Sequence, residues 1–124
     1  MKILNPRVHG YLDYIAVLYL LAAPSLFGFS GLPATILYVI AAAYLVMILL
    51  TNYPLGVVKV IPFPLHGGVE LLTGILFIAL PWAAGFADAG TLARNVYVAT
   101  GAVLFAVWLV TDYRAAEATD HVAA

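Results

Sequence analysis

The sequence predicts an all-α integral membrane protein of four transmembrane helices, arranged as two tandem helical hairpins. Three observations predict it: the composition, four long apolar stretches and an internal repeat. The chain has 124 residues, of which 65% are hydrophobic and 9% are charged, and its mean hydropathy is +1.07. A soluble domain carries about 25% charged residues because its surface must be hydrated. We therefore expect lipid to surround most of this molecule.

Four apolar stretches are long enough to cross a bilayer, at residues 8–27, 33–51, 68–86 and 95–111. At ~1.5 Å per residue, stretches of roughly 17–20 residues span most of a ~30 Å hydrocarbon core. The first stretch follows Lys2 and Arg7 and contains Ala22-Ala23, so a secretory signal peptide is an alternative for it. Asp13 within the stretch and a full counterpart at 66–86 favour a helix of the mature protein.

An internal repeat sets the architecture. At an offset of 57 residues, His9-Gly10, Asp13, Pro24 and Gly28-Phe29 recur as His66-Gly67, Glu70, Pro81 and Gly85-Phe86. At an offset of 60, Thr51 and Tyr53 recur as Thr111 and Tyr113. We divide the single membrane domain 1–124 into repeat one (9–53), an interfacial connection (54–65), repeat two (66–113) and a flexible tail (114–124). Because each repeat holds two helices, the hairpins are parallel repeats, related by a pseudo-two-fold axis along the membrane normal.

The few basic residues predict the topology. Short cytoplasmic segments are enriched in Lys and Arg. Lys2, Arg7, Lys59 and Arg114 lie in the termini and the middle connection, whereas the two hairpin loops contribute only Arg94. This asymmetry predicts that both termini are cytoplasmic and that the connection lies at the cytoplasmic interface.

Other features restrict partners and cofactors. The chain lacks Cys, which excludes disulfides, thiolate metal sites and thioether-linked haem. A net charge of −1 without a basic cluster argues against nucleic-acid binding. Small residues allow helices to approach closely in membranes, and we expect that role for Gly67, Gly74, Gly101 and Ala102.

The repeated His and acidic residues form the candidate site. His9 and Asp13 are four residues apart, as are His66 and Glu70, so each pair lies on one helix face. The repeat places both pairs at a similar depth, near the cytoplasmic boundary. A lipid-exposed, unpaired carboxylate there costs a few kcal/mol. We therefore expect both acids to face the bundle interior, where the pseudo-axis can bring the two pairs together.

Three interpretations of these four residues stay open. In the first, they are structural, and each acid is satisfied by its own His, by helix-start N–H groups or by a tyrosine. In the second, they bind zinc, iron or manganese, or a facing His pair clamps a haem iron. In the third, they form a proton or small-solute path.

The outer ends of the repeats resemble a known family. Leu80-Pro81-Trp82-Ala83-Ala84-Gly85-Phe86 and its counterpart Ala23-Pro24-Ser25-Leu26-Phe27-Gly28-Phe29 are similar to the motif of the SPW-repeat family of small bacterial membrane proteins. Ser25 stands where the family has Trp, and neither copy has Ser before Pro. The resemblance covers about residues 9–113. It implies a multi-pass protein of the bacterial inner (plasma) membrane, and it implies no activity.

We therefore expect a non-enzymatic protein of structural or interaction function whose partner is the lipid bilayer. Four short helices enclose little interior, which allows a homodimer. A metal- or haem-binding membrane protein is the alternative hypothesis.

Overall fold

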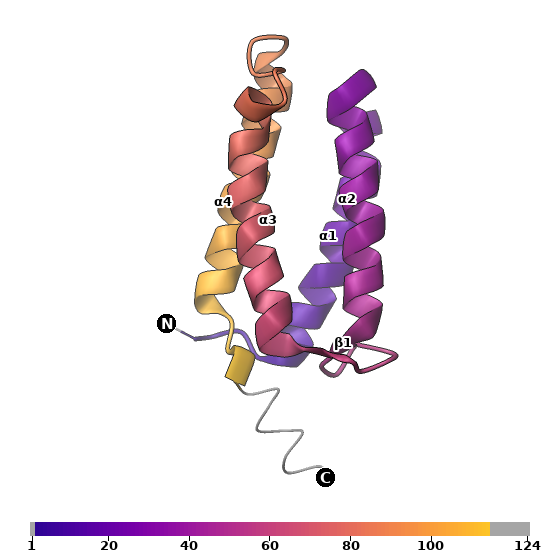
Figure 1. The fold of residues 1–124 in the computed structure, drawn as a ribbon, viewed down its shortest axis with the longest axis vertical. Coiled ribbons are helices and arrows are strands. Elements are labelled where there is room, and N and C mark those ends of the chain that lie inside the picture. Colours follow the sequence, from indigo (N-terminus) through magenta and orange to yellow (C-terminus); the bar gives the residue numbers. More distant parts are fainter. Residues whose placement is uncertain (1, 115–124) are drawn as a thin grey trace.

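The computed structural model describes residues 2–114, and its architecture is four long helices joined by short connections (Figure 1). The helices are α1 (Pro6–Phe27), α2 (Gly31–Leu50), α3 (Phe63–Ala83) and α4 (Thr91–Val110). All four are long and apolar enough to cross a membrane. This confirms the predicted all-α fold with four membrane spans. The predicted flexible tail, apart from Arg114, lies outside the described residues.

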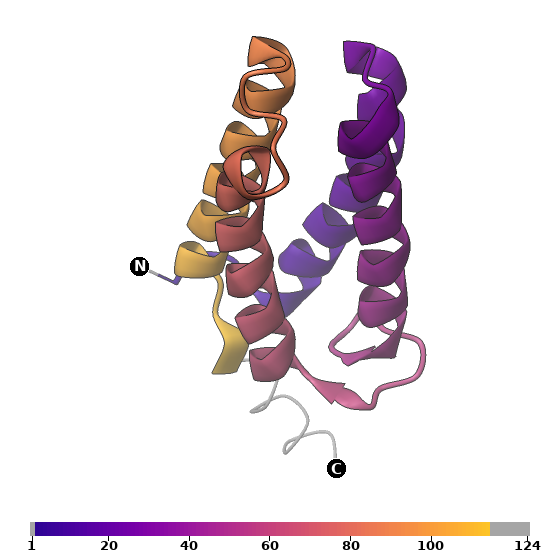
Figure 2. The ribbon, with the colours of Figure 1, turned by 45° about the horizontal axis from the view of Figure 1, so that its top comes forward.

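The helices form two hairpins that run in the same sense. α1 packs on α2, and α3 packs on α4. The first helix of each hairpin starts at the same end of the molecule, called the base here, where the hairpins meet (Figures 1 and 2). Away from the base the hairpins diverge. The relation of the hairpins as parallel repeats about a pseudo-two-fold axis stays a prediction.

Repeated residues end the first helix of each hairpin. Pro24 and Pro81 lie in the last turns of α1 and α3, and Gly28 and Gly85 follow with φ of 70° and 80°. The N–H groups of Phe29 and Phe86 each donate to the carbonyl of that proline at 2.8 Å. This left-handed turn satisfies carbonyls that the ending helix leaves without partners. The repeated Pro and Gly-Phe residues therefore form the same type of C-terminal turn in α1 and in α3.

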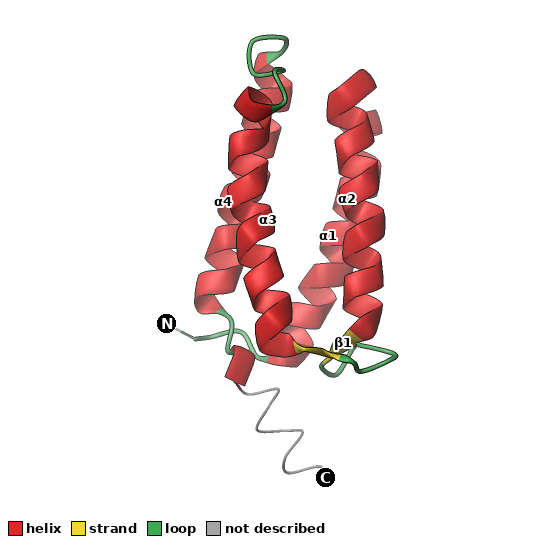
Figure 3. Cartoon of the chain, in the orientation of Figure 1, coloured by secondary structure: helices red, strands yellow, loops and turns green. Residues whose placement is uncertain are grey.

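Short backbone pairings join the hairpins at the base. The two-residue strands β1 (Thr51–Asn52) and β2 (Ile61–Pro62) pair in parallel, with Thr51 opposite Ile61 (Figure 3). Leu4 makes a parallel bridge with Thr111. Leu4 and Ile61 are equivalent in the repeat, as are Thr111 and Thr51. In both pairings, the segment that leads into one hairpin binds the end of the other hairpin.

The start of α3 differs from the expected boundaries. The helix begins at Phe63, inside the predicted connection 54–65 and before the apolar stretch at residue 68. Pro64 lies in its first turn, where a missing N–H breaks no helical hydrogen bond. Proline therefore starts this helix, although it reads as a helix breaker in the sequence.

The small residues predicted at helix contacts behave differently from one another. A Cβ at Gly101 would overlap the carbonyl oxygen of Gly74, and one at Gly67 would lie 2.8 Å from the ring of Tyr113. α3 and α4 can therefore approach closely at Gly74 and Gly101. Ala102 is exposed instead, because the residue after Gly101 points about 100° further around the helix.

Candidate functional site

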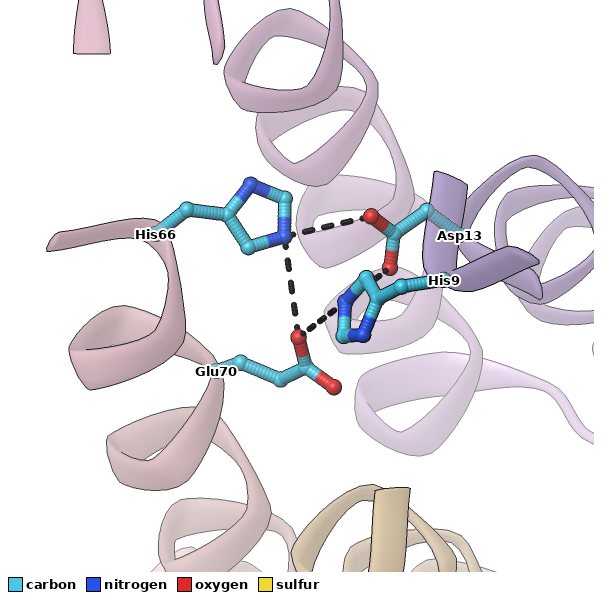
Figure 4. Close-up of side chains that lie close together, drawn as sticks. All are labelled: His9, Asp13, His66 and Glu70. Carbon is cyan, nitrogen blue, oxygen red and sulfur yellow. Dashed lines mark ion pairs between the residues drawn. The ribbon is translucent and has the colours of Figure 1, made fainter. Parts of the chain in front are cut away.

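The four predicted site residues meet at the base of the molecule. His9 and Asp13 come from α1, and His66 and Glu70 come from α3 (Figure 4). All four are buried, with at most 2% of each residue exposed. The Nε2 atom of His9 lies 3.1 Å from Asp13 and 2.8 Å from Glu70. The Nε2 atom of His66 lies 3.2 Å from Asp13 and 3.6 Å from Glu70. Each imidazole therefore faces both carboxylates, its own and that of the other repeat.

Two buried threonines contact the Nδ1 atoms of the imidazoles, on the side of each ring away from the carboxylates. The hydroxyl of Thr111 lies 2.8 Å from Nδ1 of His9, and that of Thr51 lies 2.8 Å from Nδ1 of His66. Each hydroxyl also donates, at 2.6 Å, to the backbone carbonyl four residues earlier. A hydroxyl has a single hydrogen, so each threonine oxygen accepts from the imidazole. Nδ1 is therefore protonated in both rings, and Nε2 is the nitrogen presented to the cluster.

These Nε2 atoms are the least satisfied polar atoms of the site. Both are buried, and neither makes a hydrogen bond to any described residue. The nearest carboxylate oxygens are within ion-pair distance, 2.8 Å from Nε2 of His9 and 3.2 Å from Nε2 of His66. In Figure 4, the ring nitrogens and the carboxylates face a common space. The two nitrogens are therefore directed at a point between the groups.

The four ligand atoms lie close enough together to surround a single ion. One N or O atom from each residue can be chosen so that all four lie within 4.8 Å of one another. Tetrahedral zinc has bonds of about 2.0–2.1 Å, which places its ligand atoms about 3.3 Å apart. The nitrogen–oxygen distances of 2.8–3.6 Å lie on both sides of that value.

Tyrosines surround the two carboxylates unequally. Tyr44 and Tyr53 donate to the two oxygens of Asp13, at 2.9 and 2.8 Å. Glu70 receives a longer contact, 3.5 Å, from Tyr113. Tyr53 and Tyr113 are equivalent in the repeat, whereas the equivalent of Tyr44 is Leu104. Each half of the site thus has one histidine, one acid and one supporting threonine, but the tyrosines around the two acids differ.

Tyr53 and Tyr113 lie beyond the ends of the spanning helices and remain protonated donors. Burial, followed by the negative charge of Asp13, raises the pKa of Tyr53 above its ordinary value. Burial, followed by the charge of Glu70, raises the pKa of Tyr113. Both hydroxyls therefore donate to the carboxylates and do not compete with them as anions.

In the sequence, the threonines and tyrosines that support the site are distinguished only by their recurrence in both repeats. Thr51 and Thr111, like Tyr53 and Tyr113, recur at the offset of 60, but their residue types alone do not assign them to the site. Their recurrence was the signal that could have found them. Tyr44 and Phe63, whose ring packs edge-on against both imidazoles at 5.2 and 5.4 Å, have no copy in the other repeat.

The comparisons with known proteins give one match. The family model described as "SPW repeat domain" matches residues 7–116, which is most of the chain. No curated protein and no solved structure matches the chain significantly.

Proposed function

The chain belongs to the SPW repeat domain family, and from this premise we propose that it is a multi-pass membrane protein that binds one divalent transition-metal ion. His9, Asp13, His66 and Glu70 are the proposed ligands. The ion would join α1 to α3 and so hold the two hairpins together at the base. Family membership carries no activity, so the proposal depends on the chemistry of the cluster.

The observation that carries the proposal is the pair of buried Nε2 atoms without hydrogen bonds. A histidine that ligates a metal uses a neutral ring, and its other nitrogen usually donates to a fixed acceptor. Thr51 and Thr111 provide that acceptor for His66 and His9. The rings are thus held in the tautomer and orientation that ligation requires.

The charges of the cluster support the same proposal. Asp13 and Glu70 would place two negative charges inside a membrane, which is costly without compensation. A divalent cation compensates both charges with a single ion. Two imidazolium rings would also compensate them, because carboxylate oxygens lie 2.8 Å from Nε2 of His9 and 3.2 Å from Nε2 of His66. A metal ion would in addition use both Nε2 atoms, which make no hydrogen bond to any described residue.

The donor set narrows the choice of ion. Two imidazole nitrogens and two carboxylate oxygens suit zinc, iron or manganese, whereas magnesium and calcium prefer oxygen ligands. A haem clamped between the rings fits poorly, because the carboxylates of Asp13 and Glu70 lie where the macrocycle would pass. Four protein ligands without an open position are typical of structural zinc sites. The metal proposal therefore includes the structural function expected from the sequence.

We also propose the surroundings of the protein. Lys2, Arg7, Lys59 and Arg114 belong to segments at the base, and Arg94 belongs to the opposite end. The positive-inside rule then supports a cytoplasmic base. The resemblance of the repeats supports the bacterial plasma membrane, with lipid as the partner of the exposed apolar faces. A homodimer remains compatible with these faces, and nucleic-acid binding has no support in the charge pattern.

Elemental analysis of the purified protein tests the metal proposal. The protein should be produced with a histidine-free affinity tag, purified in detergent and analysed as isolated and after incubation with Zn²⁺. We expect one equivalent of a transition metal per chain, and its loss in the double variant His9→Ala, His66→Ala. Asp88→Asn, which changes an exposed acid at the far end of the molecule, should retain the metal.

Folding must be controlled in the same samples. Circular dichroism and gel filtration show whether each variant keeps its helices and its size. Folded wild-type protein that neither contains nor takes up a stoichiometric metal would overturn the proposal. Equal metal content in the wild type and a folded double variant would overturn it as well.

A further inference from the structure

A cavity of about 460 Å³ lies between the hairpins, beside the cluster. Its walls are apolar side chains of α1 and α4: Leu12, Ala16, Leu20, Ala99, Val103 and Val107. Its volume is within the range of small-molecule sites, roughly 300–1,000 Å³. Several wall residues, Ala99 and Val103 among them, are exposed, so the cavity opens at the surface of the bundle. Because the walls belong to membrane-spanning helices, a molecule would enter from the bilayer.

The two ends of the cavity differ in chemistry. Asp13, Glu70 and Tyr44 line it at the end toward the base. Toward the other end, the hydroxyls of Tyr19 on α1 and Thr100 on α4 bond to each other at 2.9 Å. From Asp13 to Tyr19, α1 rises about 9 Å. The cavity therefore fits a molecule with an apolar body of that length and a polar head near the carboxylates.

The unequal surroundings of the carboxylates indicate the chemistry of that head. Both oxygens of Asp13 accept tyrosine hydroxyls, from Tyr44 and Tyr53. At the position equivalent to Tyr44, Leu104 also lines the cavity but offers no hydroxyl to Glu70. Carboxylate oxygens are strong acceptors with capacity for more than one donor. A hydroxyl on the bound molecule can donate to Glu70 in the place of the missing tyrosine.

We propose that this cavity binds a bilayer-soluble molecule with one apolar chain and a hydroxyl head, and that the head donates a hydrogen bond to Glu70. This goes beyond metal binding, and it needs only the cavity and the carboxylate. An apolar chain alone would fill the cavity but would not supply Glu70 with the second hydroxyl that Asp13 has.

Photolabelling in a bilayer tests the proposal. The full chain is placed in phosphatidylcholine nanodiscs with an 8-carbon primary alcohol, whose extended chain matches the cavity length, and which carries a diazirine in mid-chain. We expect mass spectrometry to place the label on residues 12–20 and 99–107. 1-Octanol should compete at least tenfold better than 1-methoxyoctane, which has the same chain but no donor. Labelling of these residues with equal competition by the two compounds would overturn the claim for a hydroxyl head.

A matched pair of variants separates the cavity from the general lipid surface. Ala99→Phe fills the cavity, whereas Ala106→Phe adds the same ring at an exposed position of α4 outside it. We expect at least a tenfold loss of labelling with Ala99→Phe and no loss with Ala106→Phe. Label spread evenly over lipid-facing residues, or cross-linked dimers in its place, would overturn the proposal. Metal content measured in the same samples shows whether the metal proposal fails separately.

Discussion

Each repeat contributes one histidine and one acid to the cluster, but the residues around the two acids differ. His9 and His66 each have a threonine partner, Thr111 and Thr51, at the same distance of 2.8 Å. Asp13, by contrast, accepts two tyrosine hydroxyls, whereas Glu70 receives one contact of 3.5 Å. The duplicated parts are those that fix the direction of the rings, and the parts that differ are those around the acids. The threonine–histidine contacts are therefore common to both repeats, whereas the tyrosine contacts to the acids are specific to each repeat.

The largest expected difference lies between the two acids. Asp13→Ala removes a ligand and leaves the hydroxyls of Tyr44 and Tyr53 buried without their acceptor, so its cost should include about 1–3 kcal/mol for each. Glu70→Ala removes a ligand but affects only the long contact from Tyr113. Both variants should bind the metal more weakly, and Asp13→Ala should unfold at the lower denaturant concentration in detergent micelles. Equal loss of stability in the two variants would show that the tyrosines contribute little.

Removal of the metal should destabilise the base of both repeats together. A chelator should lower the melting temperature of the wild type, because the ion binds only the folded arrangement of α1 and α3. The double variant His9→Ala, His66→Ala should melt at one temperature with or without the chelator. The same chelator-induced shift in both proteins would place the effect outside the cluster.

The threonines should behave as equals. Thr51→Val and Thr111→Val each remove the acceptor of one Nδ1–H, and loss of such a partner lowers metal affinity by about 10–100-fold. Thr51→Ser and Thr111→Ser keep the hydroxyl and should bind Zn²⁺ like the wild type. Competition with a chromophoric chelator measures these affinities. A tenfold difference between the two valine variants would contradict the equivalence of the repeats.

The tyrosines at the ends of α2 and α4 should differ. Tyr53→Phe loses a 2.8 Å hydrogen bond to a carboxylate, worth about 1.5–3 kcal/mol. Tyr113→Phe loses a contact of 3.5 Å, at the limit of hydrogen bonding. The free energy of unfolding should therefore fall more in Tyr53→Phe. A larger effect of Tyr113→Phe would mean that Glu70 is bound more tightly than the distances indicate.

The smallest expected effect comes from copying Tyr44 into the second repeat. Leu104→Tyr should supply a hydroxyl to Glu70 and stabilise the protein by about 0.5–1.5 kcal/mol relative to Leu104→Phe, which has the ring without the hydroxyl. Thermal unfolding of the two variants gives the difference. If Leu104→Phe is the more stable, residue 104 does not correspond to Tyr44 in space.

The sequence predicts the spans and the ligands because both leave local patterns. Long apolar stretches predict the four helices, and His9 and Asp13 copied at one offset predict which side chains share a depth. Local patterns do not predict which residues of one repeat contact the other repeat. Thr111 supports His9 only because the end of each hairpin pairs with the segment leading into the other, and that depends on how the hairpins meet. Tyr44 has no copy, so the repeat gave no signal for it.

The start of α3 and the cavity also follow from three-dimensional packing. Pro64 is compatible with a turn and with a first helical turn, and the structure places it in the latter. The cavity lies between the hairpins, and residues far apart in the sequence line it. Composition alone assigns those residues to the lipid face.

X-ray absorption spectroscopy of the protein loaded with one equivalent of Zn²⁺ tests the central claim most directly. We predict a first shell of two nitrogens and two oxygens at about 2.0–2.1 Å, with outer-shell scattering from two imidazoles. The scattering from one ring should disappear in His9→Ala and in His66→Ala alike. A shell made of oxygen alone, without imidazole scattering, would contradict a metal ion held between the two repeats.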